Sequence, residues 1–475
     1  MPILGDMPSD PLPSSASREE LLALIDALQR QVAELTAANE TLRAQLDRLT
    51  RAGKSQATPF SKGTRLQNPK KPGRKPGQGR FCSRPAPPDD ALTSPPVAVP
   101  VTQTACPSCG GALAPPHVEV VTVTDLPQPP RPTVTAYAVE TCRCLVCGRS
   151  VRGFHPAVAP NQRGATAHRL GPSLFATAHW LHYGLGVPVR KVPAILAHVG
   201  GVPLTQGALT RDALRRAEGC VGEAYHHLRQ QVQAAAAVHT DDTGWKVGGE
   251  RAHLMAFETA TVSVYQIRPR HRNEEVREVI PSDYDGTMIT DRGKSYDAQE
   301  LRAVKQQKCL AHLQRSLSQA MERQRESEQW FGRELKELLS EAVALWHAYH
   351  EGERADFAPK REALKRAITA QLTDRTLADA ENQRLLNELG RHHDRGNLVR
   401  FLDDPTISPT NNAAERALRP AVIARKVSQC SKNERGAGAY AAFVSVVRTL
   451  AKSGSDRMIE GLSHLFQRAR SPATP

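Results

Sequence analysis

Three acidic residues have neighbours that suit metal-dependent chemistry. Asp241 lies in His-Thr-Asp-Asp-Thr-Gly-Trp, Asp291 in Thr-Asp-Arg-Gly-Lys-Ser-Tyr, and Glu415 in Thr-Asn-Asn-Ala-Ala-Glu-Arg. We expect the two Asp residues to follow strands and Glu415 to lie in the first turn of a helix. Carboxylates brought together on rigid elements are what a pair of Mg²⁺ ions requires for phosphodiester chemistry. The pattern therefore predicts a two-metal site.

The charge of the chain favours a polyanionic partner. Its 475 residues include 63 Lys and Arg against 49 Asp and Glu, so the formal net charge is +14. Net charge bears on binding rather than on fold, and a merely basic soluble protein is the alternative. Combined with the three acids, the charge predicts that the chain cuts and joins DNA.

Length and composition indicate a soluble protein of two or three domains. Hydrophobic residues make up 40% of the chain and charged residues 24%. No apolar run approaches the roughly 20 residues of a membrane helix, and the N-terminus lacks the basic-then-apolar layout of a secretory signal. We therefore expect a cytoplasmic protein with no membrane partner.

A seven-residue leucine repeat predicts a coiled coil over residues 18–50. The leucines are Leu21, Leu28, Leu35, Leu42 and Leu49. The other core positions hold Ile25, Val32, Asn39 and Leu46. β-branched residues with one buried Asn favour a parallel two-stranded coil, so we expect a homodimer or a higher multimer. An amphipathic helix packed on its own chain is the alternative.

Residues 51–100 are basic and then Pro-rich, which predicts a disordered linker. Residues 51–80 contain nine Lys and Arg and no acid. Too few apolar groups are present to offset the entropy of folding. Arg74 and Lys75 lie in a Gly-Arg-Lys-Pro-Gly segment that could enter an A·T minor groove. A solvated linker with weak phosphate contacts is an equal alternative.

Two Cys-x-x-Cys-Gly turns predict a structural zinc site within residues 101–155. The four cysteines are Cys106, Cys109, Cys144 and Cys147, and Cys142 is a spare that could replace Cys144. Four thiolates satisfy tetrahedral Zn²⁺. Residues 118–123 and 133–139 alternate like strands between the turns. Together these features predict a zinc ribbon in a reducing compartment.

Residues 164–230 have a helical pattern. We expect an apolar helix over 170–184 and two short helices around a turn at Gly200 and Gly201, the second with basic residues. This arrangement is typical of helix-turn-helix DNA-binding domains. Any compact all-helical linker domain would give the same pattern, so DNA reading stays one of two interpretations.

Residues 231–312 predict a series of strands with one helix. The expected strands are 234–238, 252–258, 261–267, 286–290 and 305–308, with a helix at 274–280. In this prediction Asp241 follows the first strand and Asp291 ends the fourth. The order resembles the ribonuclease H fold, which places those strand ends side by side.

A Cys-x-x-His pair and a long helical segment follow. Cys309 and His312 offer only two soft metal ligands, so His312 could instead contact the scissile phosphate or support the metal site. A core histidine is the alternative. Residues 313–402 predict a helical insertion, after which the core resumes over 403–465. The expected aromatic anchors of the insertion are Trp330, Phe331, Trp346 and Tyr349.

Four motifs together resemble the transposase of the bacterial insertion sequence 66 family. They begin at Asp241, Thr290, Cys309 and Asn411, and Arg425-Lys426 follows the last. The resemblance covers nearly the whole chain, including the coil, the zinc module and the insertion. It implies a multidomain protein with an α/β ribonuclease H-like core. By the same resemblance Asp241, Asp291 and Glu415 are the DDE triad.

The resemblance has two departures from the family pattern. The family often has Asp-Glu-Thr where this chain has Asp241-Asp242-Thr243, so Asp242 remains an alternative metal ligand. It also often has Asp where this chain has Thr410. In addition, Asn412 and Glu415 could form a helix-capping pair, which is a structural alternative for the third acid.

The chemistry expected is two-metal phosphoryl transfer. Asp241 would bridge two Mg²⁺ (or Mn²⁺) ions, and Asp291 and Glu415 would complete the two sites. A water would cut the DNA, and the freed 3′-hydroxyl would then attack the target. The cations expected to hold DNA phosphates are Arg416, Arg419, Arg425 and Lys426, with a solvated basic face as the alternative.

The resulting hypothesis is a DNA transposase of a bacterial insertion sequence, associated with the nucleoid. It would cleave element ends, transfer strands into target DNA, and accept accessory proteins of the same element as partners. One alternative is a nuclease of the same fold that hydrolyses DNA without strand transfer. Another is a DNA-binding regulator, against which the intact acids argue.

Overall fold

The computed structural model describes most of the chain after residue 130 and short pieces before it. The described residues are 26–39, 98–100, 105, 107–112, 114–115, 131–155, 157–159, 161–373, 375–428, 430–454 and 457–468. The chain divides into two compact units, Met1–Thr122 and Val123–Pro475. Within the described part, no helix combines the length and apolar character needed to cross a membrane.

In the first unit, a helix covers residues 26–39, the middle of the predicted coil. Three of its predicted core positions, Leu28, Val32 and Leu35, are exposed. The rest of the 18–50 segment lies outside the described residues, so pairing of two coils stays a prediction. Arg74, Lys75 and Cys106 also lie outside the described residues.

The second unit begins with a small hairpin at the second cysteine turn. Strands β1 (Thr141–Arg143) and β2 (Ser150–Arg152) pair antiparallel around Cys144 and Cys147. The strand predicted at 133–139 is wrong, because these residues are irregular and almost all exposed. Alternation alone does not make a strand where no covered face is available. The strand predicted at 118–123 lies outside the described residues.

The helices predicted within 164–230 are present. They are α2 (Pro172–His179), α3 (Val192–Gly200), α4 (Gln206–Ala217) and α5 (Cys220–Gln233), with a π-helical turn at Trp180–Gly184. Gly201 ends α3 in the left-handed conformation (φ 65°), and the Thr205 hydroxyl caps α4 by accepting from the Ala208 N–H. The two short helices around the glycine turn are thus confirmed.

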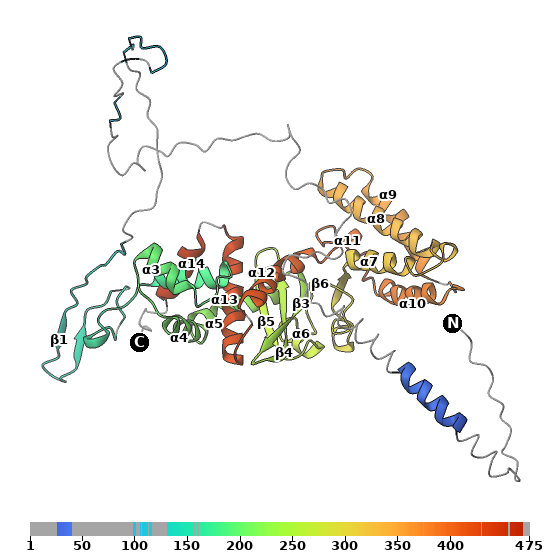
Figure 1. The fold of residues 1–475 in the computed structure, drawn as a ribbon, viewed down its shortest axis with the longest axis horizontal. Coiled ribbons are helices and arrows are strands. Elements are labelled where there is room, and N and C mark those ends of the chain that lie inside the picture. The colour runs from blue at the N-terminus through green and yellow to red at the C-terminus, as the bar shows by residue number, and fades with distance from the viewer. Residues whose placement is uncertain are drawn as a thin grey trace, which may run out of the picture. The chain divides into compact units, whose positions relative to one another are not determined.

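A mixed five-stranded sheet forms the centre of the second unit (Figure 1). Its strands are β3 (Ala237–Val247), β4 (Glu250–Glu258), β5 (Ser263–Arg268), β6 (Thr287–Thr290) and β7 (Lys305–Lys308). The order across the sheet is β5-β4-β3-β6-β7. β3 pairs antiparallel with β4 and parallel with β6, and β6 pairs parallel with β7. The four strands predicted after the first are therefore confirmed within a few residues.

The first predicted strand, 234–238, is wrong in its extent. β3 runs to Val247, so Asp241 and Asp242 lie inside the strand instead of after it. The strand continues because it pairs with β4 as far as Val247↔Glu250, and Gly248 and Gly249, both with positive φ, close the hairpin. Asp and Gly are poor strand formers, and the pairing of Asp241, Asp242 and Gly244 with β4 outweighs their preference.

Helices cover both faces of the sheet. α12 (Asn412–Ser428) packs on β3 and β4, and α13 (Glu434–Lys452) packs on β5. We call the face they cover the α12 face. The opposite face packs against α5 and against α6 (Asn273–Arg277), which is shorter than the helix predicted at 274–280. We call it the α6 face. α14 (Met458–Arg468) packs on α2 and α13.

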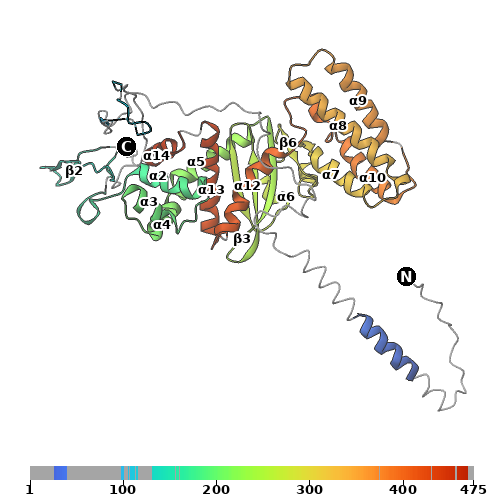
Figure 2. The same cartoon turned by 45° about the horizontal axis from the view of Figure 1, so that its top comes forward.

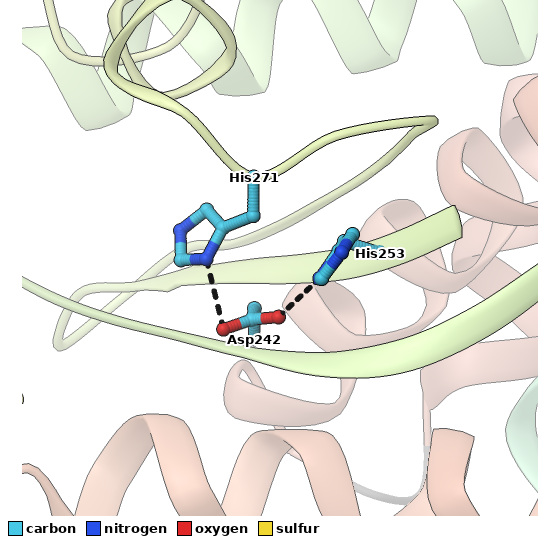
Figure 3. Close-up of side chains that lie close together, drawn as sticks. All are labelled: Asp242, His253 and His271. Atoms are coloured by element: carbon cyan, nitrogen blue, oxygen red, sulfur yellow. Dashed lines mark hydrogen bonds and ion pairs between the residues drawn. The ribbon is translucent and has the colours of Figure 1, made fainter. Parts of the chain in front are cut away.

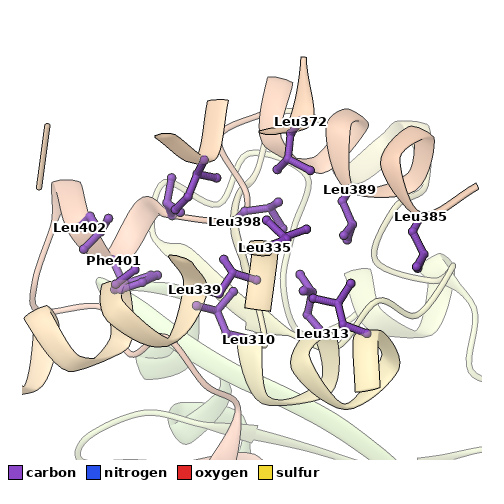
Figure 4. Close-up of a cluster of buried hydrophobic side chains, with 14 of the residues drawn as sticks. Leu310, Leu313, Leu335, Leu339, Leu372, Leu385, Leu389, Leu398, Phe401 and Leu402 are labelled. Carbon is purple, nitrogen blue, oxygen red and sulfur yellow. The ribbon is translucent and has the colours of Figure 1, made fainter. Parts of the chain in front are cut away.

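A helical group joins the sheet through α7 (Leu310–Met321). It consists of α8 (Trp330–His350), α9 (Phe357–Leu372), α10 (Ala380–Asp394) and α11 (Arg400–Asp403). Figure 2 shows α8, α9 and α10 beyond α7. A leucine-rich core joins these helices, with Leu313 of α7 packed among residues such as Leu335 and Leu389 (Figure 4). The predicted helical character of 313–402 is confirmed.

The predicted aromatic anchors of this group differ in their environments. Phe331 is fully buried, and Trp346 donates from Nε1 to the Pro405 carbonyl at 2.8 Å. Tyr349 packs on the Phe357 ring. Trp330 is not a buried anchor, because 38% of it is exposed.

Candidate active site

The register of β3 and β6 places Asp241 beside Asp291. The two parallel strands pair at Ala237↔Thr287, Val238↔Met288 and His239↔Ile289. Each Asp comes two residues after the last pair, Asp241 within β3 and Asp291 directly after β6, so the register brings the two acids next to each other. Asp241 lies on the α12 face, because His239 and Asp241 alternate with Val238, which packs on the α6 side.

Beyond the last β3–β6 pair, groups from distant segments of the chain donate hydrogen bonds to the strand carbonyls. The buried Asn411 side chain donates from Nδ2 to the Thr240 carbonyl at 2.8 Å. The Cys309 N–H donates to the Thr290 carbonyl at 2.7 Å. The start of α12 and the start of α7 are thereby attached to the strands next to the two acids.

Glu415 enters this site from the first turn of α12, as predicted. Asn412 is the first residue of that helix, and the Glu415 N–H donates to the Asn411 carbonyl at 3.2 Å. Glu415 therefore lies one position beyond the residue that closes a capping box. The capping interpretation of Asn412 and Glu415 does not fit this geometry.

The three carboxylates interact electrostatically. Burial raises the pKa of Asp241 to about 6, and the charges of Asp291, Asp242 and Glu415 add to the shift, while a hydrogen bond from the Asp242 N–H opposes it. Asp291 is oriented by the Gly293 N–H, which donates to Oδ1 at 2.8 Å. A raised pKa among convergent acids is typical of a site that binds cations.

Asp242 faces the other side of the sheet. Its Oδ2 accepts from His253 Nδ1 at 2.7 Å and its Oδ1 lies 2.9 Å from His271 Nδ1 (Figure 3). Burial opposes ionisation, but the hydrogen bonds from His271 and His253 outweigh it and lower the pKa of Asp242. Since β3 side chains alternate between faces, this geometry favours Asp241 over Asp242 as the partner of Asp291 and Glu415.

His312 lies at the edge of the acidic site. Its Nε2 is 3.5 Å from Glu415 Oε1, and 30% of its side chain is exposed, which does not fit a core histidine. A hydrogen bond with Cys309 raises the pKa of His312. Cys309 is buried, and its Sγ accepts from the Asn411 N–H at 3.2 Å. The Cys-x-x-His pair therefore connects α7 to the start of α12.

The predicted DNA-contacting cations of α12 divide into two kinds. The exposed ones are Arg416, Arg419 and Lys426. Arg425 is partly buried and donates to Thr243 Oγ1 at 3.2 Å and to the Gly244 carbonyl. Arg425 thus fastens α12 to β3 through Nη1, and its contact with DNA phosphate stays a prediction.

Comparison with known proteins identifies the family. The family model described as Transposase IS66 family matches residues 168–439, which is more than half of the chain. The chain belongs to the IS66 transposase family. Membership indicates a transposase-type function.

Individual relatives add little to this assignment. This IS66 family protein is 24% identical over 468 residues to "Uncharacterized protein y4hP" of Sinorhizobium fredii (strain NBRC 101917 / NGR234), covering 91% of this chain and 79% of that protein. It is 12% identical to the HTLV-2 integrase catalytic core domain, solved in complex with magnesium in a trimeric form. That match covers 31% of this chain and 90% of the integrase chain, and its TM-score of 0.14 is too low to support any inference.

Sequence reasoning about the IS66 family protein missed a charged tether beside Asp291. Arg292 forms an ion pair with Glu388 of α10 and donates to Ser316 of α7. The helical group is thereby attached to the loop that carries the second acid. An Arg next to a predicted acid was the available signal, but its partner lies 96 residues away.

Lys308 was also missed. This fully buried residue at the end of β7 lies 2.8 Å from Asp297 Oδ1 and donates to Thr290 Oγ1 at 3.2 Å. Burial lowers the pKa of Lys308, and Asp297 opposes that shift. The residue before Asp291 is therefore held by a buried cation. Nothing in the polar Lys-Gln-Gln-Lys sequence of this strand indicated that its last three residues are buried.

The donor set of the acidic site suits a pair of hard cations. Three carboxylates offer only oxygen ligands, which Mg²⁺ and Mn²⁺ prefer. Two ions about 4 Å apart require ligands spread more widely than one ion does. Among the described residues, Glu415 also lies in a group with Cys309 and His312 whose ligand atoms are all within 4.8 Å of one another.

Proposed function

We propose that this IS66 family protein is a DDE transposase that cuts DNA at the ends of an insertion sequence and joins the freed ends to target DNA. The observation that carries the proposal is the equivalent register of Asp241 and Asp291, with the charge of Glu415 acting on Asp241. The strand order β5-β4-β3-β6-β7, with three antiparallel strands followed by two parallel additions, supports a ribonuclease H-like core.

Asp241 would hold both Mg²⁺ ions, and Asp291 and Glu415 would each complete one site. The ions would supply an activated water and neutralise charge on the leaving 3′ oxygen. His312 would orient the Glu415 carboxylate from 3.5 Å away. The exposed Arg416, Arg419 and Lys426 would hold phosphates of the bound DNA.

The N-terminal half would bind the DNA ends and bring two chains together. We propose structural zinc on the Cys106, Cys109, Cys144 and Cys147 thiolates. The Cys147 N–H donates to Cys144 Sγ at 3.5 Å, and this turn lowers the pKa of the Cys144 thiol, which favours the metal-binding form. The residue 18–50 coil would bring two chains together, and the 164–230 helices would contact the element end.

A strand-transfer assay distinguishes this function from hydrolysis alone. Purified full-length protein is incubated with a labelled element end, a target plasmid, and Mg²⁺ or Mn²⁺. We expect nicked element ends followed by labelled DNA covalently joined to the plasmid. Cleavage that never yields joined product, even with a pre-cut end, would contradict transposition and favour a nuclease.

A further inference from the structure

We propose that Asp242, His253 and His271 form a second metal site, for a divalent transition-metal ion of the zinc type. The site lies on the α6 face of the sheet, opposite the face that carries Asp241. It does not depend on the proposed transposase chemistry, because none of its ligands belongs to the acidic triad.

The three side chains come from three separate elements and point at one another (Figure 3). Asp242 lies in β3, His253 in β4, and His271 in the loop between β5 and α6. His253 Nδ1 is 2.7 Å and His271 Nδ1 is 2.9 Å from the Asp242 carboxylate. One ligand atom from each residue lies within 4.8 Å of the others. Small outward shifts would accommodate bonds of about 2.0–2.2 Å to a central ion.

The kind of ligand decides the kind of ion. Two imidazoles with one carboxylate suit Zn²⁺, Co²⁺ and similar borderline ions, whereas Mg²⁺ prefers oxygen ligands alone. Each imidazole would bind the ion through Nδ1 as the tautomer that carries its proton on Nε2. Three protein ligands leave at least one coordination position for water.

The surroundings hold the ligands in place and leave a route for the ion. His271 is largely buried, with 11% of its side chain exposed, and its ring meets Tyr296 edge-on at 5.4 Å between centroids. His253 and Asp242 are more open, at 38% and 24%. An ion could therefore enter from the solvent side, past His253 and Asp242, and bind His271, whose ring is already held in place by Tyr296.

Such an ion would link β3 to its neighbours on the face of the sheet opposite Asp241. Asp242 lies within β3, which continues for five more residues to Val247. Crosslinking it to β4 and to the 269–272 loop would restrict movement of the strand that also carries Asp241. The competing possibility is a triad held by hydrogen bonds alone, without any affinity for an ion.

Cobalt titration of the full chain separates these possibilities. Co²⁺ is added in excess Mg²⁺, which occupies the carboxylate site, and visible absorption is recorded. Cysteine-bound cobalt shows a sulfur charge-transfer band in the near ultraviolet, so cobalt on Asp242, His253 and His271 is recognised by d–d bands without it. We expect one equivalent of Co²⁺ per chain to give these sulfur-free bands, and we expect Zn²⁺ to displace it.

Variants assign the signal. His253→Gln and His271→Gln keep an amide that can donate to Asp242 but weaken metal binding, so each should lower cobalt affinity at least about tenfold. The exposed His226→Gln is the matched control and should bind as wild type. Asp291→Asn should also keep the signal, which separates this site from the catalytic one. Thermal unfolding without metal verifies that the variants are folded. Absence of the sulfur-free bands in wild type, or their persistence in both folded Gln variants, would overturn the proposal.

Discussion

Asp241 in β3 and Asp291, the first residue after β6, each lie two positions beyond the last backbone pair of these parallel strands, His239↔Ile289. This relationship brings two acids 50 residues apart in the chain next to each other. Beyond the last β3–β6 backbone pair, the starts of α12 and α7 pack next to the two acids. They contribute Glu415 and His312. The site is therefore a consequence of where strand pairing ends.

Asn411 should stabilise the attachment of α12 to β3. Asn411→Ala leaves the buried Thr240 carbonyl without its side-chain donor, and we expect a loss of about 1–3 kcal/mol in the free energy of unfolding. Denaturant unfolding measures it. The neighbouring Asn412→Ala, at an exposed position, is the control and should change stability by less than about 0.5 kcal/mol. Equal effects of the two changes would contradict the role assigned to Asn411.

Asp241→Asn should stabilise the protein at neutral pH when no Mg²⁺ is added. The pKa of Asp241 is about 6 in the folded state against an ordinary value of 3.8. The folded wild type therefore binds a proton more tightly, and its stability falls as pH rises from about 4 through 6. Asn does not ionise, so the variant gains at most about 3 kcal/mol at pH 7 and nothing below pH 4. Unfolding curves at both pH values test this, and a difference independent of pH would refute it.

His312 should act as a positioning residue for Glu415. We expect His312→Ala to lower DNA cleavage about 10- to 100-fold and to raise the Mg²⁺ concentration needed for half-maximal activity. The shifted Mg²⁺ dependence is the decisive readout, because a purely structural defect would not be corrected by added metal. His312→Gln should recover part of the activity. A variant with unchanged metal dependence would show that the contact with Glu415 has no function.

The Arg292–Glu388 pair should couple the helical group to the Asp291 loop. Both side chains are mostly buried, so removing either is expected to cost about 1.5–3 kcal/mol. A double-mutant cycle with Arg292→Met and Glu388→Gln measures their coupling free energy. The exposed pair Lys305–Asp285 provides a reference cycle, where coupling should be below about 1 kcal/mol. Additive effects at Arg292 and Glu388 would argue against the tether.

Local patterns were sufficient for many elements but not for long-range pairing. The strands after β3 and the helix that carries Glu415 follow from alternation and from the motifs around Asp291 and Glu415. The length of β3 was not predicted, because Asp241, Asp242 and Gly244 are poor strand formers that stay in the strand through pairing with β4. For the same reason the motif alone could not decide between Asp241 and Asp242. Their faces are defined only once β3 is known to continue through both.

The contacts that hold the site together had no sequence signal. Asn411 meets Thr240 across 171 residues, and the buried Lys308 contacts Thr290, Asp297 and the Asn397 carbonyl. A buried polar residue resembles a surface one in sequence when its partners are distant. The zinc site and the coiled coil stay predictions, since Cys106 and most of residues 18–50 lie outside the described part of the chain.

The most direct measurement compares Asp291→Asn with Asp285→Asn in Mg²⁺-dependent cleavage of a labelled element end. Both changes remove one carboxylate from the same region, but Asp285 is a fully exposed surface acid paired with Lys305. We expect Asp291→Asn to lower cleavage and joining by at least about 1,000-fold with its folding intact, and Asp285→Asn to retain wild-type activity. Cleavage by folded Asp291→Asn at the wild-type rate would contradict the three-carboxylate site.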